Sequence, residues 1–339
     1  MWHDTWEVRD GPADPEAWLE AAYYDQSVVT QIDTAHADHA VSGDQATGRP
    51  TSSATLPSLL VQMYRHAMIT DDMDILDVGT GSGYGAALLS ARLSDAHVVS
   101  IDVDEYLTKI AAERLDKISF RPDVRAVDAT GPLPGTYDRI IATVAVRPIP
   151  ASWLAALRPD GRLVTTISGT NLILTADKTP DGGATGRTEW DRAGFMDART
   201  GSSCRHVMPD RFTAIREADG DHVASSQLPV INVNQAWDLY STFGIMVPDV
   251  VHHYEEDPDG TRTAWILHPD GSWARATAKG NKSPVIHQAG PQRLWDTLDD
   301  LRSQWLCDGS LPAYGAKARI TPDGTVHLSR GRWQATITN

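Results

Sequence analysis

Apolar and polar residues form two recurring patterns along the first half of the chain. Short, nearly continuous apolar runs are typical of buried strands, and longer segments with apolar residues three or four positions apart are typical of helices. Because strands that alternate with helices of ordinary length usually form one parallel sheet, the region from Pro57 to Ile167 predicts a doubly wound α/β fold. The expected strands are residues 75–78, 97–104, 124–129, 137–146 and 161–167, and the expected helices are residues 57–68, 84–93, 105–118 and 150–157.

Three glycines at alternate positions follow the first expected strand, in the stretch LDVGTGSGY. Gly79, Gly81 and Gly83 precede a helix at the carboxyl edge of the sheet, where doubly wound folds bind their ligands. Such glycines either let a ligand lie against the backbone or only allow close packing of strand and helix. Asp102 favours the first interpretation, because it ends the second strand, where an acid commonly accepts hydrogen bonds from ribose hydroxyls. Together these residues predict a nucleoside site.

The second half of the chain has a different pattern. Residues 175–196 are polar and rich in turn residues, and we expect the apolar stretch AGFM at their end to return to the core. Residues 230–247 and 291–306 predict helices, and residues 261–278 and 318–337 predict hairpins with Pro-Asp-Gly turns. Aromatic residues crowd this half and form either a core or a peptide-binding groove. The expected parts are an N-terminal segment with the substrate and cofactor loop (1–56), a cofactor-binding domain (57–200) and a C-terminal α+β substrate-recognition domain (201–339).

Charge and composition argue against several classes of protein. The net charge of −15 argues against nucleic-acid binding, which requires a basic face. No apolar run reaches the roughly 20 residues of a membrane helix, and the N-terminus is too polar for a secretory signal, so we expect a cytoplasmic protein without a membrane partner. Cys204 and Cys307 lack metal-ligand spacing, and we expect two buried thiols. His252 and His253 would point to opposite faces of a strand, so no metal site is expected.

The glycine stretch continues as DVGTGSGYGAALL, which resembles motif I of the S-adenosylmethionine-dependent methyltransferases. Further along, SIDVD resembles their ribose-binding segment, and AVDAT resembles the segment whose acid faces the adenine, without its usual flanking glycines. The resemblance implies S-adenosyl-L-methionine as the cofactor and a Rossmann-like class I methyltransferase sheet with a C-terminal α+β extension. The cofactor-binding residues that it implies are Asp77, Gly79, Thr80, Gly81, Gly83, Tyr84, Asp102, Val103, Asp128 and Ala129.

Two earlier stretches, YYDQSVVTQ and TSSATLPSLLVQM, are similar to the first loop and helix of the protein-L-isoaspartate O-methyltransferase family. The resemblance covers about residues 23–170. It implies that Ser53 and Thr55, with Ser52 beside them, are catalytic residues that orient the acceptor carboxylate next to the methyl donor. Without the resemblance, the same residues would be an ordinary polar turn in which Thr55 or a neighbour caps the helix.

The C-terminal extension departs from the repair enzymes of this family. It resembles that of methyltransferases which modify ribosomally synthesised peptides such as lasso peptides, graspetides and lanthipeptides. This resemblance implies methylation of an L-aspartate side chain in a constrained or cyclised peptide, after which the ester closes to an aspartimide. Three alternatives stay open: repair of isoaspartyl residues in damaged proteins, a peptide-binding module without turnover, and O-methylation of a small molecule.

Overall fold

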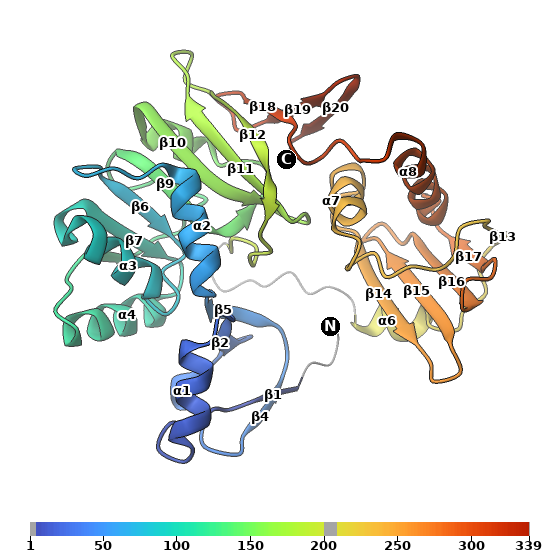
Figure 1. Ribbon diagram of the computed structural model, residues 1–339, viewed down its shortest axis with the longest axis horizontal. Helices are drawn as coiled ribbons and strands as arrows, with labels where there is room; N and C mark the ends of the chain where they lie inside the picture. The colour runs from blue at the N-terminus through green and yellow to red at the C-terminus, as the bar shows by residue number, and fades with distance from the viewer. Residues whose placement is uncertain (1–4, 200–208, 339) are drawn as a thin grey trace.

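A doubly wound sheet forms the centre of the protein, whose computed structural model describes residues 5–199 and 209–338 (Figure 1). Its parallel strands lie in the order β10-β9-β6-β7-β8, so the chain runs outward from β6 to β8 and then returns to β9 and β10 on the other side. The α/β sheet predicted from the sequence is confirmed. The bounds are β6 (Ile75–Val78), β7 (Val98–Asp102), β8 (Asp123–Ala126), β9 (Tyr137–Val146) and β10 (Leu157–Ile167).

Both faces of this sheet are buried, which explains the continuous apolar runs of its strands. Successive residues of a strand point to opposite faces, and accordingly Ile75 packs with Met63 and Leu89 while Leu76 belongs to the core around Trp153. The expected helices are confirmed as α2 (Pro57–Ala67), α3 (Tyr84–Leu93), α4 (Glu105–Lys117) and α5 (Ala151–Ala156), with a 3-10 turn, η2 (Asp95–His97), before β7.

Five antiparallel strands extend the sheet beyond β10, which gives ten strands within the described residues. The polar, turn-rich residues 175–196 supply most of a hairpin that the sequence analysis did not predict. Its polar residues are partnered: the buried Thr175 hydroxyl donates to the Glu189 carboxylate at 2.6 Å across the hairpin. The hairpin expected at residues 318–337 is confirmed, with one more strand. The added strands are β11 (Leu172–Lys178), β12 (Ala184–Arg192), β18 (Lys317–Ile320), β19 (Val326–Arg330) and β20 (Trp333–Ile337).

A second sheet of five strands, counted in the described part of the chain, forms what we call the C-terminal module (residues 209–312). Its strands are antiparallel, in the order β13-β17-β16-β15-β14. Phe243 and Trp295 are fully buried between two helices and one face of the sheet, so the core interpretation holds for these aromatic residues. The elements are α6 (Pro209–Ile215), β13 (His222–Ser225), α7 (Trp237–Met246), β14 (Val251–Glu256), β15 (Thr261–Leu267), β16 (Trp273–Lys279), β17 (Val285–Ala289) and α8 (Leu294–Asp308).

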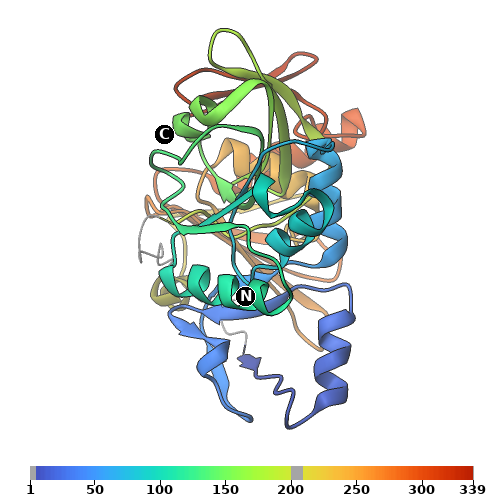
Figure 2. The ribbon, with the colours of Figure 1, turned by 90° about the vertical axis from the view of Figure 1, so that its left-hand side faces the viewer.

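The N-terminal segment lies below the large sheet in both views, whereas β18–β20 lie at its top (Figures 1 and 2). Its strand β5 pairs with β2 and leads directly into α2, so this segment is joined to the sheet beside the glycine loop. The elements are β1 (Thr5–Glu7), α1 (Pro15–Tyr23), β2 (Val28–Ile32), β3 (Ala35–His36), the 3-10 turn η1 (Ala37–His39), β4 (Gln45–Thr47) and β5 (Pro50–Ala54).

The structure also bears on the expectations for the two cysteines, for His252, and for metal and membrane binding. Cys307 is exposed near the end of α8, so the expectation of a buried thiol is wrong there, and Cys204 lies outside the described residues. His252 packs against Tyr240 and Phe243, and burial lowers its pKa to about 4. Residues 5–199 and 209–338 contain neither a His, Cys, Asp and Glu cluster placed to hold a metal nor a helix with the length and apolar character to cross a bilayer.

Candidate active site

A cavity of about 450 Å³ opens at the carboxyl edge of β6, β7 and β9. Since β6 and β9 are neighbours at the point where the strand order reverses, the cavity lies where doubly wound sheets bind their ligands. The structure brings together there most of the residues expected from the sequence. Those that line the cavity are Ser52, Ser53, Thr55, Gly79, Gly81, Asp102, Val103 and Ala129.

The glycine loop lies close against β9, where Gly79 meets Thr143. Gly79 has a φ of +102°, and a Cβ atom there would lie 2.8 Å from the Thr143 Oγ1 atom, so only glycine fits. The Thr143 hydroxyl instead donates to the Gly79 carbonyl at 3.2 Å. The loop therefore presents backbone rather than side chain to the cavity.

Asp102 borders the cavity at the end of β7, where the sequence predicts a ribose-binding acid. Its two carboxylate oxygens accept hydrogen bonds from the backbone N–H groups of Gly81, at 3.0 Å, and Asp104, at 3.1 Å. Burial raises the pKa of Asp102, while these hydrogen bonds and the charge of Arg199 act in the opposite direction. Each oxygen keeps a lone pair with which it could accept a further hydrogen bond.

Asp77 of β6 and Thr80 of the glycine loop are buried and do not line the cavity. The Ser100 hydroxyl donates to Asp77 at 2.7 Å and lies 2.7 Å from the Thr80 hydroxyl. Burial raises the pKa of Asp77 to about 7, against the hydrogen bond from Ser100. This arrangement supports the loop from below, and contact between Asp77 and the methyl donor stays a prediction.

Three further predicted residues lie at the margin of the site, outside the cavity lining. Gly83 is the N-cap of α3, and Tyr84 is the first residue of that helix. The Asp128 carboxylate accepts hydrogen bonds from the backbone N–H and the hydroxyl of Thr130, at 2.8 and 2.7 Å. Its neighbours Val127 and Ala129 line the cavity in its place.

Ser52 and Ser53 of β5 and the following Thr55 line the cavity, and the two serines lie next to Gly81 of the glycine loop. The Thr30 hydroxyl donates to Ser52 at 2.9 Å, which fixes this strand against β2. Thr55 does not cap α2: the N-cap is Leu56, and Asp25 instead accepts from the backbone N–H of Ser58 at 2.9 Å. The capping interpretation requires the Thr55 hydroxyl to accept a hydrogen bond from the start of α2, and it does not do so.

Residues 192–199 form a wall of the cavity that the sequence analysis missed. The backbone of Ala145 anchors this wall, because it donates to Met196 and accepts from Ala198, both at 2.8 Å. Arg192 and Arg199 belong to the lining and flank the apolar stretch AGFM. Two arginines around an apolar stretch in a strongly acidic chain are the signal that could have identified this wall.

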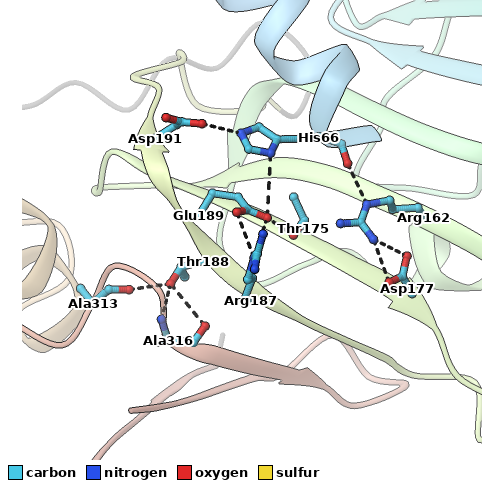
Figure 3. A network of polar contacts seen from close by, with 10 residues as sticks. All are labelled: His66, Arg162, Thr175, Asp177, Arg187, Thr188, Glu189, Asp191, Ala313 and Ala316. Carbon is cyan, nitrogen blue, oxygen red and sulfur yellow. Dashed lines mark hydrogen bonds and ion pairs between the residues drawn. The ribbon is translucent and has the colours of Figure 1, made fainter. Parts of the chain in front are cut away.

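A polar network joins α2 to the hairpin that leads into this wall (Figure 3). His66 of α2 lies 3.0 Å from Asp191 and 3.9 Å from the buried Glu189, both on β12. Glu189 also pairs with Arg187 at 3.0 Å. Because α2 follows the hydroxyl strand and Arg192 follows Asp191, the network connects two walls of the cavity.

Comparison with known proteins matches residues 19–191 to the protein-L-isoaspartate(D-aspartate) O-methyltransferase family. A protein-L-isoaspartate O-methyltransferase of Bradyrhizobium sp. (strain ORS 278) is 35% identical over 150 residues, which are 42% of this chain and 65% of that protein. The protein-L-isoaspartate O-methyltransferase 2 of Rhodopseudomonas palustris (strain HaA2) is 30% identical over 44% of this chain and 71% of its own length. A solved structure of a protein-L-isoaspartate O-methyltransferase aligns with 92% of this chain and 88% of its own, with 17% identity and a TM-score of 0.49.

Proposed function

Because the chain belongs to the protein-L-isoaspartate(D-aspartate) O-methyltransferase family, we propose that it transfers a methyl group from S-adenosylmethionine to a carboxylate of a protein or peptide. One observation carries the proposal: the glycine loop and Asp102 border the same cavity as the hydroxyl residues of β5. The groups that we propose to bind the donor and the acceptor therefore border one space.

The residues present fit the methyl donor. Asp102 would accept hydrogen bonds from the ribose hydroxyls, since its carboxylate borders the cavity and keeps free lone pairs. Gly79 and Gly81 would offer backbone to the methionine part of the donor, and Val103 and Ala129, which also line the cavity, would contact its adenine. When bound, the donor supplies a methyl group on a positively charged sulfur.

The chemistry requires positioning more than proton transfer. A carboxylate is ionised at neutral pH, so no strong general base is required. One carboxylate oxygen forms a bond to the methyl carbon as the bond from that carbon to sulfur breaks, which yields a methyl ester and S-adenosylhomocysteine. Ser53 and Thr55, with Ser52 beside them, would hold the other oxygen by hydrogen bonds. Such alignment can contribute about 7–11 kcal/mol in favourable cases.

The most specific substrate that we propose is an isoaspartyl residue. The relatives are named for isoaspartate, and this support is stronger than the resemblance that favours L-aspartate in a peptide-modifying pathway. The second candidate is an L-aspartate in a constrained peptide, whose methyl ester would close to an aspartimide. It is favoured by the position of the C-terminal module, because Trp237 of α7 lies next to Arg192 of the cavity wall.

Transfer of a radiolabelled methyl group tests the proposal. The acceptors are a short isoaspartyl peptide, the same peptide with L-aspartate, and a cyclised form of the second. We expect label in the isoaspartyl peptide, and preference for the cyclised L-aspartyl peptide would favour the second candidate. Donor binding without label in any of the three peptides would indicate a binding module or a small-molecule enzyme.

Donor binding can be tested separately with Asp102→Ala, measured by calorimetry. Loss of the charged hydrogen bonds should weaken S-adenosylmethionine binding by about 1.5–3 kcal/mol per bond. Unchanged affinity would remove Asp102 from the donor site.

A further inference from the structure

The proposed acceptor is an anion, and the protein that must bind it carries a net charge of −15. Among the described residues that line the cavity, the charged ones are Asp102, Arg192, Asp197 and Arg199. Selective capture of a carboxylate requires a cation in this set that is not already neutralised by an acid.

The two acids of the lining are already engaged. Asp102 accepts two backbone hydrogen bonds, and Asp197 accepts one from the Ser168 hydroxyl. Arg199 acts on the donor side, because its charge opposes the rise in the pKa of Asp102. Arg192 is therefore the cation of the lining that stays free for an acceptor.

Arg192 ends β12, where its backbone pairs with Leu172 of β11. Within the chain segments that the structure describes, no carboxylate forms an ion pair with its guanidinium. The guanidinium lies over the ring of Trp237, 5.9 Å from the ring centroid, which is within the range of a cation–π contact. Trp237 is the first residue of α7, so the C-terminal module supplies the surface on which Arg192 rests.

Trp237 is itself held in place. Its ring meets the ring of Tyr314 edge to face, with 4.7 Å between centroids. Tyr314 is buried, and its hydroxyl lies 2.8 Å from the Ser241 hydroxyl of α7. A fixed ring beneath a guanidinium reduces the number of orientations that the guanidinium can adopt.

We propose that Arg192 binds the acceptor carboxylate and that the C-terminal module selects substrates by holding Arg192 against Trp237; this inference rests on the proposed function. A guanidinium matches the two oxygens of a carboxylate with parallel hydrogen bonds. The negative charge of the acceptor disappears as the ester forms, so this contact is stronger in the ground state than in the transition state. Arg192 therefore increases affinity and selectivity, releases the neutral ester, and does not accelerate the chemical step.

The test compares two short synthetic peptides that differ only at the acceptor group, one with an isoaspartyl carboxylate and one with the corresponding carboxamide. Their affinities are measured by fluorescence anisotropy on the full-length protein saturated with S-adenosylhomocysteine. A charged hydrogen bond to the carboxylate should make the wild-type protein bind it about tenfold more tightly than the carboxamide. In Arg192→Gln the ratio should fall to about one, and Arg192→Lys should restore part of it.

The matched control is Arg319→Gln on β18, which changes an exposed arginine outside the cavity lining and should keep the wild-type ratio. Trp237→Ala should lower the ratio without removing it. In methyl transfer, Arg192→Gln should raise the KM for the isoaspartyl peptide about tenfold without lowering kcat.

Three results would overturn the inference: a wild-type protein without carboxylate preference, an Arg192→Gln protein that keeps this preference, or a loss confined to kcat. The proposed function fails separately, when the wild-type protein binds the carboxylate peptide selectively and transfers no methyl group to it.

Discussion

Two regions flank the cavity, and they are attached to the central sheet in different ways. The N-terminal region supplies β5 on one side, and the C-terminal module supplies the support of Arg192 on the other. In the N-terminal region, α1 has no buried residue, and Gln31 is the buried position of β2. Its links to the sheet are polar, such as the hydrogen bond from the Gln31 amide to Asp104 at 3.0 Å.

The C-terminal module has a core of its own and a mostly buried attachment. Phe243, Trp295 and Leu298 are fully buried within it. Helix α7 joins it to the sheet, where Ile245 enters the central core and Arg147 donates to the carbonyls of Gly244 and Ile245 at 2.8 and 3.2 Å. The N-terminal region therefore depends on its contacts with the central domain for its order, whereas the C-terminal module is stabilised by a core of its own.

The largest effect is expected from breaking the attachment of the module. A Cβ atom on Gly244 would lie 2.1 Å from the carbonyl oxygen of Gly169, which cannot move without disturbing the turn between β10 and β11. Gly244→Ala should lower the free energy of unfolding by about 3 kcal/mol, as overpacking of backbone does at its upper range. Denaturant unfolding measures the change. Gly131→Ala is the control, because its Cβ would meet only an ordinary contact at 3.5 Å; equal losses in both variants would contradict the interpretation.

The pH dependence of stability reports on Asp77, which is buried next to the glycine loop. The pKa of Asp77 rises from 3.8 to about 7 on folding, chiefly through burial, so between these values the folded protein binds a proton that the unfolded chain does not. Stability from this group is fully present below about pH 4 and falls as the pH rises towards 7. In the wild-type protein this group should lower the free energy of unfolding by about 2–3 kcal/mol between pH 5 and pH 8, and Asp77→Asn should remove that decrease. Urea unfolding at both values measures it, and an unchanged decrease would assign the pH dependence to other groups.

A smaller effect is expected from loosening the N-terminal wall. Gln31→Leu removes the hydrogen bond to Asp104, whose pKa that bond helps to lower against the opposing effect of burial. We expect a loss of about 1.5 kcal/mol, at the lower end for a bond to a charged group, because Asp104 keeps contact with solvent. Hydrogen exchange should accelerate in β2 and β5 and stay unchanged in the module. The exposed Gln45→Leu is the control; acceleration throughout the protein would mean that both walls unfold together.

The smallest effect is expected from the network between the two walls. Asp191→Asn weakens the pair with His66, and a partly exposed pair contributes at most about 1 kcal/mol. The melting temperature should therefore change little, while the KM for the acceptor peptide should rise if Asp191 helps to orient Arg192. A variant with wild-type KM would restrict this network to a structural role.

The positions of the proposed donor-binding residues could be predicted from the sequence because their determinants are local. Gly79 and Gly81 follow a buried strand directly, and Asp102 ends the next one, so strand-to-helix patterning places all three at one edge. The local pattern could not show that Asp77 is buried outside the cavity lining, since its partner Ser100 belongs to the neighbouring strand.

The cavity wall at residues 192–199 could not be predicted because its order comes from contacts between distant segments. Thr175 and Glu189 lie in a polar, turn-rich stretch of the sequence, and their hydrogen bond across the hairpin becomes visible only in the structure. Arg192 acquires its position from Trp237, which belongs to a separate helix. Single-sequence patterns carry no information about such pairings, whereas they predict the helices α7 and α8 and the hairpin of β15 and β16 in the module well.

The pairing of β12 with β18 changes how the C-terminal module is best regarded. Ala184–Arg187 pair with Lys317–Ile320, so the chain leaves the large sheet after β12 and returns beside the same strand. The module is thus an insertion with two neighbouring points of attachment, and not a tail. Cutting the chain near residue 200 would remove β18–β20 as well and leave β12 as a bare sheet edge. An internal deletion that rejoins the chain between β12 and β18 would instead keep all ten strands of the large sheet.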